Sequence, residues 1–245
     1  TTIIEPTLSR DHTEKMLAGL GADISIDGLT STVSKLNFPL LSFELSVPGD
    51  PSTAAFFAAA AVLVPDSELM MNRILTNPTR TGFFTALEKM GAEVECIRQW
   101  EEAGELMGDL KIFHGPLNAI TLTNQDIPGL IDELPIIAII ATQAVGKTEV
   151  RGAKELRIKE CDRIHAICTN LKKMGVDIKE LDDGFIINGP TKLKGTQIET
   201  FHDHRIAMAF TVAGLIADGN VILDYPECAF ISYPEFYDEL DNLTI

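Results

Sequence analysis

The organisation of this chain is clearest in the stretch Leu156-Arg-Ile-Lys-Glu-Cys-Asp-Arg-Ile-His-Ala-Ile-Cys-Thr-Asn-Leu-Lys-Lys-Met-Gly175. Its first four residues alternate apolar and charged side chains, which predicts the end of a strand over 156–159. Apolar residues then recur at helical spacing. This change predicts a helix with Asp162 as its N-cap and Gly175 as its end.

The junction between strand and helix is crowded with charge. Arg157, Lys159 and Arg163 accompany one carboxylate, Glu160. The first helical turn disfavours a cation such as Arg163 by roughly 0.3–1 kcal/mol, because the helix dipole is positive there. The free backbone N–H groups of that turn favour an anion. Two interpretations stay open, a solvated junction in which Arg163 pairs with Asp162 or Glu160, and an anion site.

Composition limits the classes of partner. The 245 residues carry a net charge of −16, so nucleic acid and anionic membranes are disfavoured, and an anionic ligand must be held by local cations. The four cysteines form no CxxC pair, which favours a reducing cytosol. No apolar run reaches the ~18 residues of a membrane-spanning helix, and no signal peptide is recognised. The sequence begins Thr-Thr-Ile-Ile without Met, and we expect a fragment of a longer protein.

An order of elements recurs along the chain. A strand, a helix and two strands are predicted over 1–46, and Val47-Pro-Gly-Asp50 marks a boundary. Over 47–245 the patterns predict three βαβαββ units whose first helices begin at Asp50, Asp132 and Asp203. Three helices share the ending Leu-x-x-[Leu/Met]-Gly-[Ala/Val]-[Asp/Glu]-[Val/Ile], at Leu17, Leu87 and Leu171. Residues 97–110 are expected to form a charged hairpin or loop insertion. The sequence therefore predicts an α/β (α+β) protein with domains at 1–46 and 47–245.

Arginine recurs in the first turn of four predicted helices, at Arg10, Arg80, Arg163 and Arg205. Each could be a surface ion pair worth about 0–1 kcal/mol. If the helix starts converge, the same arginines would bind several anionic groups, and carboxylates such as Asp132 and Glu160 could supply acid–base chemistry.

Metal and nucleotide sites are poorly supported. Cys161, His165 and Cys168 share a helical face, but this is also core spacing. His202-x-His204 equally suits polar residues at a helix entry. No GxGxxG, GxxxxGK[ST] or GxSxG motif is present. We expect no metal.

Five motifs, in order along the chain, resemble the 5-enolpyruvylshikimate-3-phosphate synthase family: Val47–Asp50, Asn77–Gly82, Ile131–Pro135, Leu156–Arg163 and Asp203–Met208. Ser9-Arg-Asp-His-Thr-Glu14 is similar to the bacterial branch. The resemblance implies two domains of three βαβαββ units each, related by pseudo-threefold symmetry in an inside-out barrel, with helix N-termini facing the cleft between them. Residues 1–46 would be the last unit of the other domain.

The family transfers the enolpyruvyl group of phosphoenolpyruvate to the 5-hydroxyl of shikimate-3-phosphate and releases phosphate, in the biosynthesis of aromatic amino acids. The resemblance implies a cytoplasmic enzyme, a monomer and a glyphosate target, which needs no cofactor. It implies three catalytic residues. Asp132 would accept a proton and hold shikimate hydroxyls, Glu160 would transfer a proton at the enolpyruvyl methylene, and Lys159 would contact shikimate-3-phosphate.

The implied substrate-binding residues include Asp132 and Lys159. Arg163 and Arg205 would clamp phosphoenolpyruvate, as bidentate guanidinium groups suit phosphate and carboxylate. His204 precedes that second arginine, and Arg10 would contact the phosphate of shikimate-3-phosphate.

Two positions depart from the family pattern. Cys161 stands where Ser or Thr is usual, and Ile231 stands where many members carry a lysine that contacts phosphoenolpyruvate. The family's Lys-Ser, Gly-Asn-Ala-Gly-Thr and Ser-x-Gln motifs are not found in the sequence. We therefore expect the chain to need a missing N-terminal part for turnover. The alternatives are a catalytically silent fragment and the related transferase that acts on UDP-N-acetylglucosamine.

Overall fold

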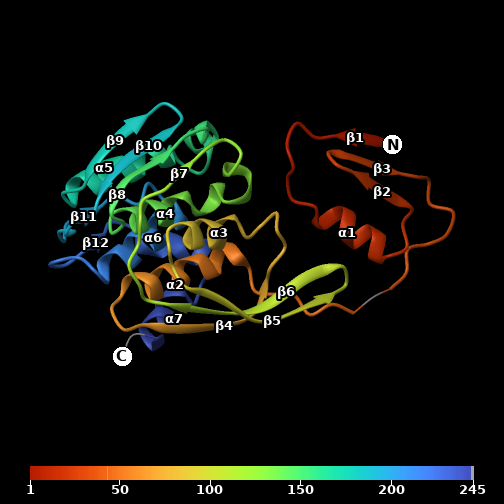
Figure 1. Cartoon of the computed structure of the whole chain (residues 1–245), viewed down its shortest axis with the longest axis horizontal. Helices are drawn as coiled ribbons and strands as arrows, with labels where there is room; N and C mark the ends of the chain where they lie inside the picture. Colours follow the sequence, from red (N-terminus) through yellow and green to blue (C-terminus); the bar gives the residue numbers. More distant parts are fainter. Residues whose placement is uncertain (43, 244–245) are drawn as a thin grey trace.

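The computed structural model describes residues 1–42 and 44–243, which form a small N-terminal unit and a larger body (Figure 1). The unit has the predicted order of one strand, one helix and two strands: β1 (Thr2–Ile4), α1 (His12–Gly19), β2 (Ile24–Asp27) and β3 (Thr30–Val33). Its strands form an antiparallel sheet in the order β1-β3-β2. Helix α1 contains no buried residue.

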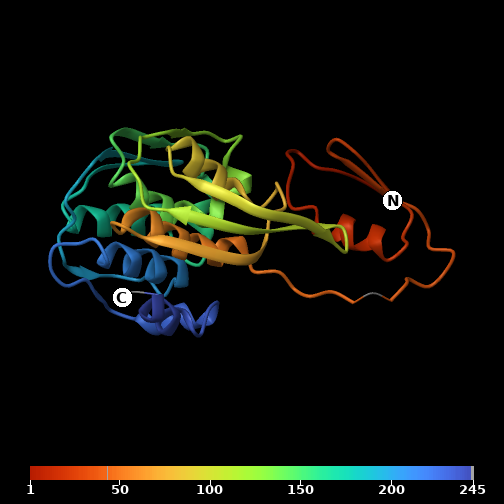
Figure 2. The same ribbon diagram turned by 60° about the horizontal axis from the view of Figure 1, so that its bottom comes forward.

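The first repeat of the body follows the prediction closely. Its elements are α2 (Pro51–Leu63), β4 (Glu68–Leu75), α3 (Gly82–Lys89), β5 (Val94–Glu102) and β6 (Glu105–Phe113). Asp50 is the N-cap of α2, and its carboxylate accepts a hydrogen bond from the Thr53 amide at 3.1 Å. The charged segment 97–110 lies in the hairpin β5–β6. The tip of this hairpin reaches α1 of the N-terminal unit (Figure 2).

The second repeat contains both helices and the sheet β7-β8-β10-β9. Its elements are β7 (Thr121–Leu122), the 3₁₀ turns η1 (Ile127–Gly129) and η2 (Ile131–Glu133), α4 (Leu134–Ala141), β8 (Gly146–Val150), η3 (Lys154–Ile158), α5 (Arg163–Lys173), β9 (Asp177–Leu181) and β10 (Gly184–Gly189). The predicted helix after Asp162 is confirmed, and Gly175 follows it with φ of +88°.

The third repeat has a shorter form. Its elements are β11 (Gln197–Ile198), α6 (His204–Gly214), β12 (Ile222–Leu223), η4 (Pro226–Ile231) and α7 (Phe236–Leu243). Strands β11 and β12 pair in parallel. The sequence patterns predict that this repeat finishes with a helix over 233–240, and α7 lies there.

The core of the body is made by the first helices of the three repeats. Helices α2, α4 and α6 pack against one another, and the sheets lie outside them (Figure 1). All eight residues of α4 are buried. A helix that is apolar on every side must be enclosed by other elements, which is why these three occupy the centre. No helix in the described ranges is both long and apolar enough to span a membrane.

Two local predictions are wrong. Residues 156–159 are not the end of a strand, because residues up to Ile158 lie in η3. Leu156 is fully buried whereas Ile158 is 82% exposed, so the alternation does not define a buried face. Asp132 does not cap α4 as Asp50 and Asp203 cap their helices. It lies within η2, which runs directly into α4.

Candidate active site

The carboxylate of Asp132 is the meeting point of three predicted arginines. Arg10 Nη2 donates to Asp132 Oδ2 at 2.8 Å, Arg163 Nη1 lies 3.5 Å from Oδ1, and Arg205 Nη2 lies 3.6 Å from Oδ2. Arg205 Nη1 also donates to the Asp132 carbonyl oxygen at 3.2 Å. These arginines come from α1's leading loop, α5 and α6, so the convergence joins distant parts of the sequence.

Asp132 is held as a carboxylate. Burial alone would raise its pKa, but the charge of Arg205, the hydrogen bond from Arg10 and the charge of Lys159 together lower that pKa below its usual range. A carboxylate ionised at neutral pH and surrounded by cations can accept a proton from a substrate hydroxyl.

Arg163 is the most enclosed of the three arginines. Its side chain is fully buried, and Nε donates to Asp203 Oδ2 at 2.7 Å while Nη2 donates to Glu160 Oε2 at 2.5 Å. The Asp203 and Glu160 carboxylates outweigh the effect of burial and raise the pKa of Arg163. In this arrangement an anion reaches Arg163 only if a carboxylate gives way. Glu160, whose side chain is 47% exposed, is the mobile candidate because Asp203 is fully buried.

Arg205 and His204 are placed by the start of α6. Asp203 is the N-cap, and its Oδ1 accepts hydrogen bonds from the backbone amides of Arg205 and Ile206. Burial, helped by the positive charge of Arg205, lowers the pKa of His204, so its imidazole is neutral at neutral pH. A neutral imidazole beside a guanidinium can donate one hydrogen bond and accept another without adding charge.

Lys159 and Glu160 follow η3 directly. Lys159 Nζ forms an ion pair with Glu155 at 2.7 Å, and its charge lowers the pKa of Asp132. The junction thus places one cation and one carboxylate near the Asp132 centre, and the catalytic roles of Lys159 and Glu160 stay predictions.

Sequence reasoning missed two buried acids at this centre, Glu133 and Asp203. Burial raises the pKa of Glu133, and its Oε1 has no hydrogen-bond partner among the described residues. Adjacent carboxyl groups with pKa values shifted in opposite directions, here Asp132 and Glu133, are typical of acid–base sites. The available signal was the acidic pair directly before an apolar helix.

Two other predicted cations lie outside this centre. Arg80 donates to Asp50 at 2.6 Å and to Ser52 at 2.9 Å, outside the group of arginines at Asp132. Arg157 points away. Its guanidinium donates to the carbonyl oxygens of Leu181 and Asp182 and to two carboxylates. Arg10 and Arg80 also precede the N-caps of their helices, whereas the prediction placed them in the first turn.

The cysteines and histidines form no metal-like cluster in the part of the chain that the structure describes. Cys161 Sγ donates to Asp203 Oδ2 at 3.6 Å, and burial together with Asp203 raises the thiol pKa to about 12. The His202 ring lies against the Tyr225 ring in a tilted arrangement, with ring centroids 5.0 Å apart. These contacts account for both residues without a metal ligand role.

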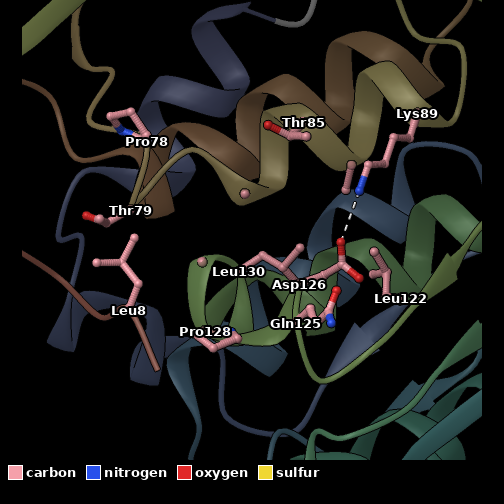
Figure 3. A pocket seen from close by; sticks show the side chains of 13 residues that line it. Leu8, Pro78, Thr79, Thr85, Lys89, Leu122, Gln125, Asp126, Pro128 and Leu130 are labelled. Carbon is pink, nitrogen blue, oxygen red and sulfur yellow. Dashed lines mark hydrogen bonds and ion pairs between the residues drawn. The ribbon is translucent and has the colours of Figure 1, made fainter. Parts of the chain in front are cut away.

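A separate cavity of about 270 Å³ lies between α3 and η1 (Figure 3). Leu8, Thr79 and Leu130 are among its lining residues, and its two charged residues, Lys89 and Asp126, pair at 3.0 Å. None of the predicted site residues lines it. Its charges neutralise each other, so it offers no anion site.

Comparison with known proteins gives one consistent family. Residues 1–240 match the EPSP synthase family, described as 3-phosphoshikimate 1-carboxyvinyltransferase. The chain is 47% identical over 247 residues to the protein of that name from Persephonella marina, and 48% identical over 244 residues to that from Carboxydothermus hydrogenoformans. These alignments include 99% and 100% of this chain but only 57% of each relative.

Solved structures agree. The EPSP synthase of Acinetobacter baumannii superimposes with a TM-score of 0.94 at 35% identity, over 99% of this chain and 56% of that one. The enolpyruvyl transferase NikO from Streptomyces tendae has the same fold, with a TM-score of 0.72 at 22% identity over 99% of this chain and 55% of that one. The chain therefore spans little more than half the length of the proteins that it matches.

Proposed function

The chain belongs to the EPSP synthase family, and on this basis we propose that it forms one part of an enzyme that transfers an enolpyruvyl group. The donor is phosphoenolpyruvate, the acceptor is the 5-hydroxyl of shikimate-3-phosphate, and phosphate is released. The observation that carries the proposal is the convergence of Arg10, Arg163 and Arg205 on the carboxylate of Asp132. Both substrates are polyanions, and guanidinium groups bind phosphate and carboxylate through paired hydrogen bonds.

The first step is an addition. The 5-hydroxyl oxygen bonds to C2 of phosphoenolpyruvate, the C2=C3 double bond opens, and C3 receives a proton. Asp132, which is ionised at neutral pH, is the candidate acceptor of the hydroxyl proton. Glu160, which is half exposed and held by Arg163, is the candidate donor to C3, with Lys159 beside it.

The second step is an elimination. Glu160 takes a proton back from C3, the C2=C3 double bond forms again, and the C2–oxygen bond to phosphate breaks. The proton that Asp132 accepted leaves with the phosphate. The developing negative charge on the phosphate is stabilised by Arg163 and Arg205, together with His204. Arg10 and Lys159 are proposed to hold the phosphate of shikimate-3-phosphate. Binding requires each arginine to share or exchange the carboxylates that it now contacts.

The relatives are longer than this chain, and we propose that the remaining part of the site lies in the region that they contain in addition. The 245 residues alone are then expected to bind phosphate-like anions weakly and not to turn over. Holding both reactants in the reactive geometry can lower the activation free energy by up to about 7–11 kcal/mol, and this gain is lost when the cleft is open to water. The complete enzyme is proposed to be a cytoplasmic monomer that glyphosate inhibits.

The test is phosphate release in the presence of both substrates, from a protein with the full length of its relatives. Arg163→Ala should lower kcat/KM for phosphoenolpyruvate by an amount equivalent to roughly 1.5–3 kcal/mol, the usual size of a lost charged hydrogen bond. Arg151→Ala is the matched control, because Arg151 also pairs with a carboxylate but belongs to β8's surface end. Equal constants for both variants would refute the assignment. Turnover with UDP-N-acetylglucosamine as the acceptor would instead assign the chain to the related transferase that acts on that substrate.

A further inference from the structure

The turn that leads into α6 has an unusual backbone. Phe201 and His202 are consecutive residues other than glycine, with φ of +53° and +56°. Residues with a Cβ rarely occupy this left-handed region, and they remain there only when the surrounding structure forces them to. Such strain is often found at functional sites, and the next residue is Asp203.

The side chains of Thr200 and Asp224 hold the turn through hydrogen bonds. Thr200 donates to Asp224 Oδ1 through both its backbone amide, at 2.9 Å, and its hydroxyl, at 2.8 Å. The Thr200 hydroxyl in turn accepts from the His202 amide at 3.4 Å, and the Thr200 carbonyl accepts from the Asp203 amide at 3.0 Å. Thr200 is fully buried. The chain is thus fixed on both sides of the strained pair.

The topology explains why these residues meet. Strands β11 and β12 are parallel neighbours, with Ile198 opposite Leu223. Thr200 follows the first strand and Asp224 follows the second. Because parallel strands end at the same edge of their sheet, the two side chains emerge together there.

Aromatic rings also pack against the turn. The His202 ring lies against Tyr225 with centroids 5.0 Å apart, and the Phe201 ring meets the His165 ring edge-on at 6.2 Å. His165 belongs to α5, the helix that begins with Arg163. The turn is therefore clamped between β12's end and the helix that carries the central arginine.

The contacts of this turn fix the position of Asp203. Its carboxylate is fully buried, accepts from Arg163 Nε at 2.7 Å, and caps α6 through the amide of Arg205 at 2.8 Å. A small change in the turn would move this carboxylate. Both arginines proposed to hold phosphoenolpyruvate would then lose their alignment.

We propose that Thr200 and Asp224 are positioning residues, which hold the strained Phe201–His202 turn so that Asp203 aligns Arg163 and Arg205 for the anionic substrate. This inference rests on the proposed function. It adds residues that touch neither substrate and act only through Asp203. A turn with a purely local structural role would affect stability but not the binding of substrate.

The first test compares Thr200→Val with Thr200→Ser in a protein with the full length of its relatives. Valine keeps the shape of threonine and removes the hydroxyl, whereas serine restores it. Loss of the hydroxyl should lower kcat/KM for phosphoenolpyruvate by about tenfold, the size of one lost hydrogen bond to a charged group. The serine variant should stay close to the wild type, and KM for shikimate-3-phosphate should change less than KM for phosphoenolpyruvate.

The second test separates positioning from stability and remains informative if Thr200→Val fails to fold. Glycine adopts the left-handed region freely, so His202→Gly removes the strain and loosens the turn. We expect an unchanged or higher melting temperature together with a lower kcat/KM for phosphoenolpyruvate. His202→Asn is the control, since asparagine tolerates this conformation and should preserve activity.

The outcomes are distinct. A wild-type kcat/KM in His202→Gly would overturn the inference, and so would equal losses in His202→Gly and His202→Asn, which would assign the effect to the imidazole itself. If the unmodified enzyme does not release phosphate from its two substrates, the proposed function fails instead.

Discussion

The N-terminal unit and the body of this protein are built from similar elements but are stabilised in different ways. Helix α4 in the body has all eight residues buried, whereas α1 in the unit has none. Ile4 in β1 is 75% exposed, while Ile140 in α4 is fully buried. A three-stranded sheet with one helix needs a buried apolar face for independent stability. Among the described residues, helix α1 and strand β1 of the unit bury no apolar face.

The contacts between the unit and the body are polar. Asn77, which is fully buried, donates to Asp11 at 2.6 Å and to Glu105 at 2.9 Å. Glu105, at the start of β6, also contacts His12 at 2.5 Å. Another contact between the unit and the body is the Arg10–Asp132 pair. The body is thus held by apolar burial, and the unit is positioned by a few hydrogen bonds and charges, one of which belongs to the proposed active site.

Matched isoleucines should show the largest difference between the two regions. Ile140→Ala should lower the free energy of unfolding of the body by about 2–5 kcal/mol, because it leaves a cavity in a packed core. Ile4→Ala should change it by less than about 0.5 kcal/mol, because the side chain is already exposed. Denaturant titration of both variants measures this. Similar losses would mean that the unit contains a core of its own.

Removal of Asn77 should release the unit without unfolding the body. Asn77→Ala leaves Asp11 and Glu105 without a buried donor, at a cost of about 1–3 kcal/mol. We expect faster hydrogen exchange in α1 and faster proteolysis of residues 34–42, with the amides of α4 still protected. Asn72→Ala, an exposed change on β4, is the control. Equal protection of α1 in the two variants would contradict the role given to Asn77.

The acidic pair should respond to pH with opposite signs. The pKa of Asp132 is lowered in the folded protein, so its contribution to stability is present above its ordinary pKa and is lost as the pH falls through the folded value. The pKa of Glu133 is raised, so its protonated form is favoured, and stability is lost as the pH rises from its ordinary pKa through the folded value.

Stability curves of two variants check these signs. Asp132→Asn should remove part of the acid-induced loss below about pH 4, the ordinary value for this side chain. Glu133→Gln should gain stability over the wild type, increasingly so as the pH rises above that range. The same sign for both variants would show that the two carboxyl groups share one environment.

The Arg10–Asp132 pair should have the smallest effect on stability. The Arg10 side chain is 47% exposed, and exposed ion pairs contribute about 0–1 kcal/mol. Arg10→Ala should therefore lower the free energy of unfolding by no more than this, and less at high salt. Lys35→Ala in the same unit is the control. A loss well above 1 kcal/mol would mean that this pair, and not Asn77, holds the unit to the body.

Sequence patterns predicted most elements of the fold because helical spacing and N-caps are local signals. The helices after Asp50, Asp162 and Asp203 begin where their caps predict. The strand expected over 156–159 failed because Arg157 donates hydrogen bonds to Glu180 and Leu181 of β9, which is distant in the sequence. The role of each candidate site residue, and the division into domains, remain predictions.

The sequence predicted the cations of the candidate site and two of its acids, Asp132 and Glu160, but not its two buried acids, Asp203 and Glu133. Arg10, Arg163 and Arg205 were selected because arginine is unusual near helix starts. Asp203 and Glu133 were missed because an N-cap and a residue before an apolar helix have ordinary local explanations. Their importance comes from burial against arginines of other repeats, which only the tertiary structure supplies.

The most direct test of the account is the rate of phosphate release by Asp132→Asn, in a protein with the full length of its relatives and with saturating substrates. Asparagine keeps the shape of aspartate and cannot accept a proton, so kcat should fall by about 10²–10⁴, the usual contribution of a general base. Asp126→Asn is the matched control, because Asp126 also has a lowered pKa and an ion pair, with Lys89, but lies in the separate cavity. We expect a wild-type rate for Asp126→Asn and near loss of turnover for Asp132→Asn. A wild-type rate for Asp132→Asn would contradict the central claim that this carboxylate is the reaction centre.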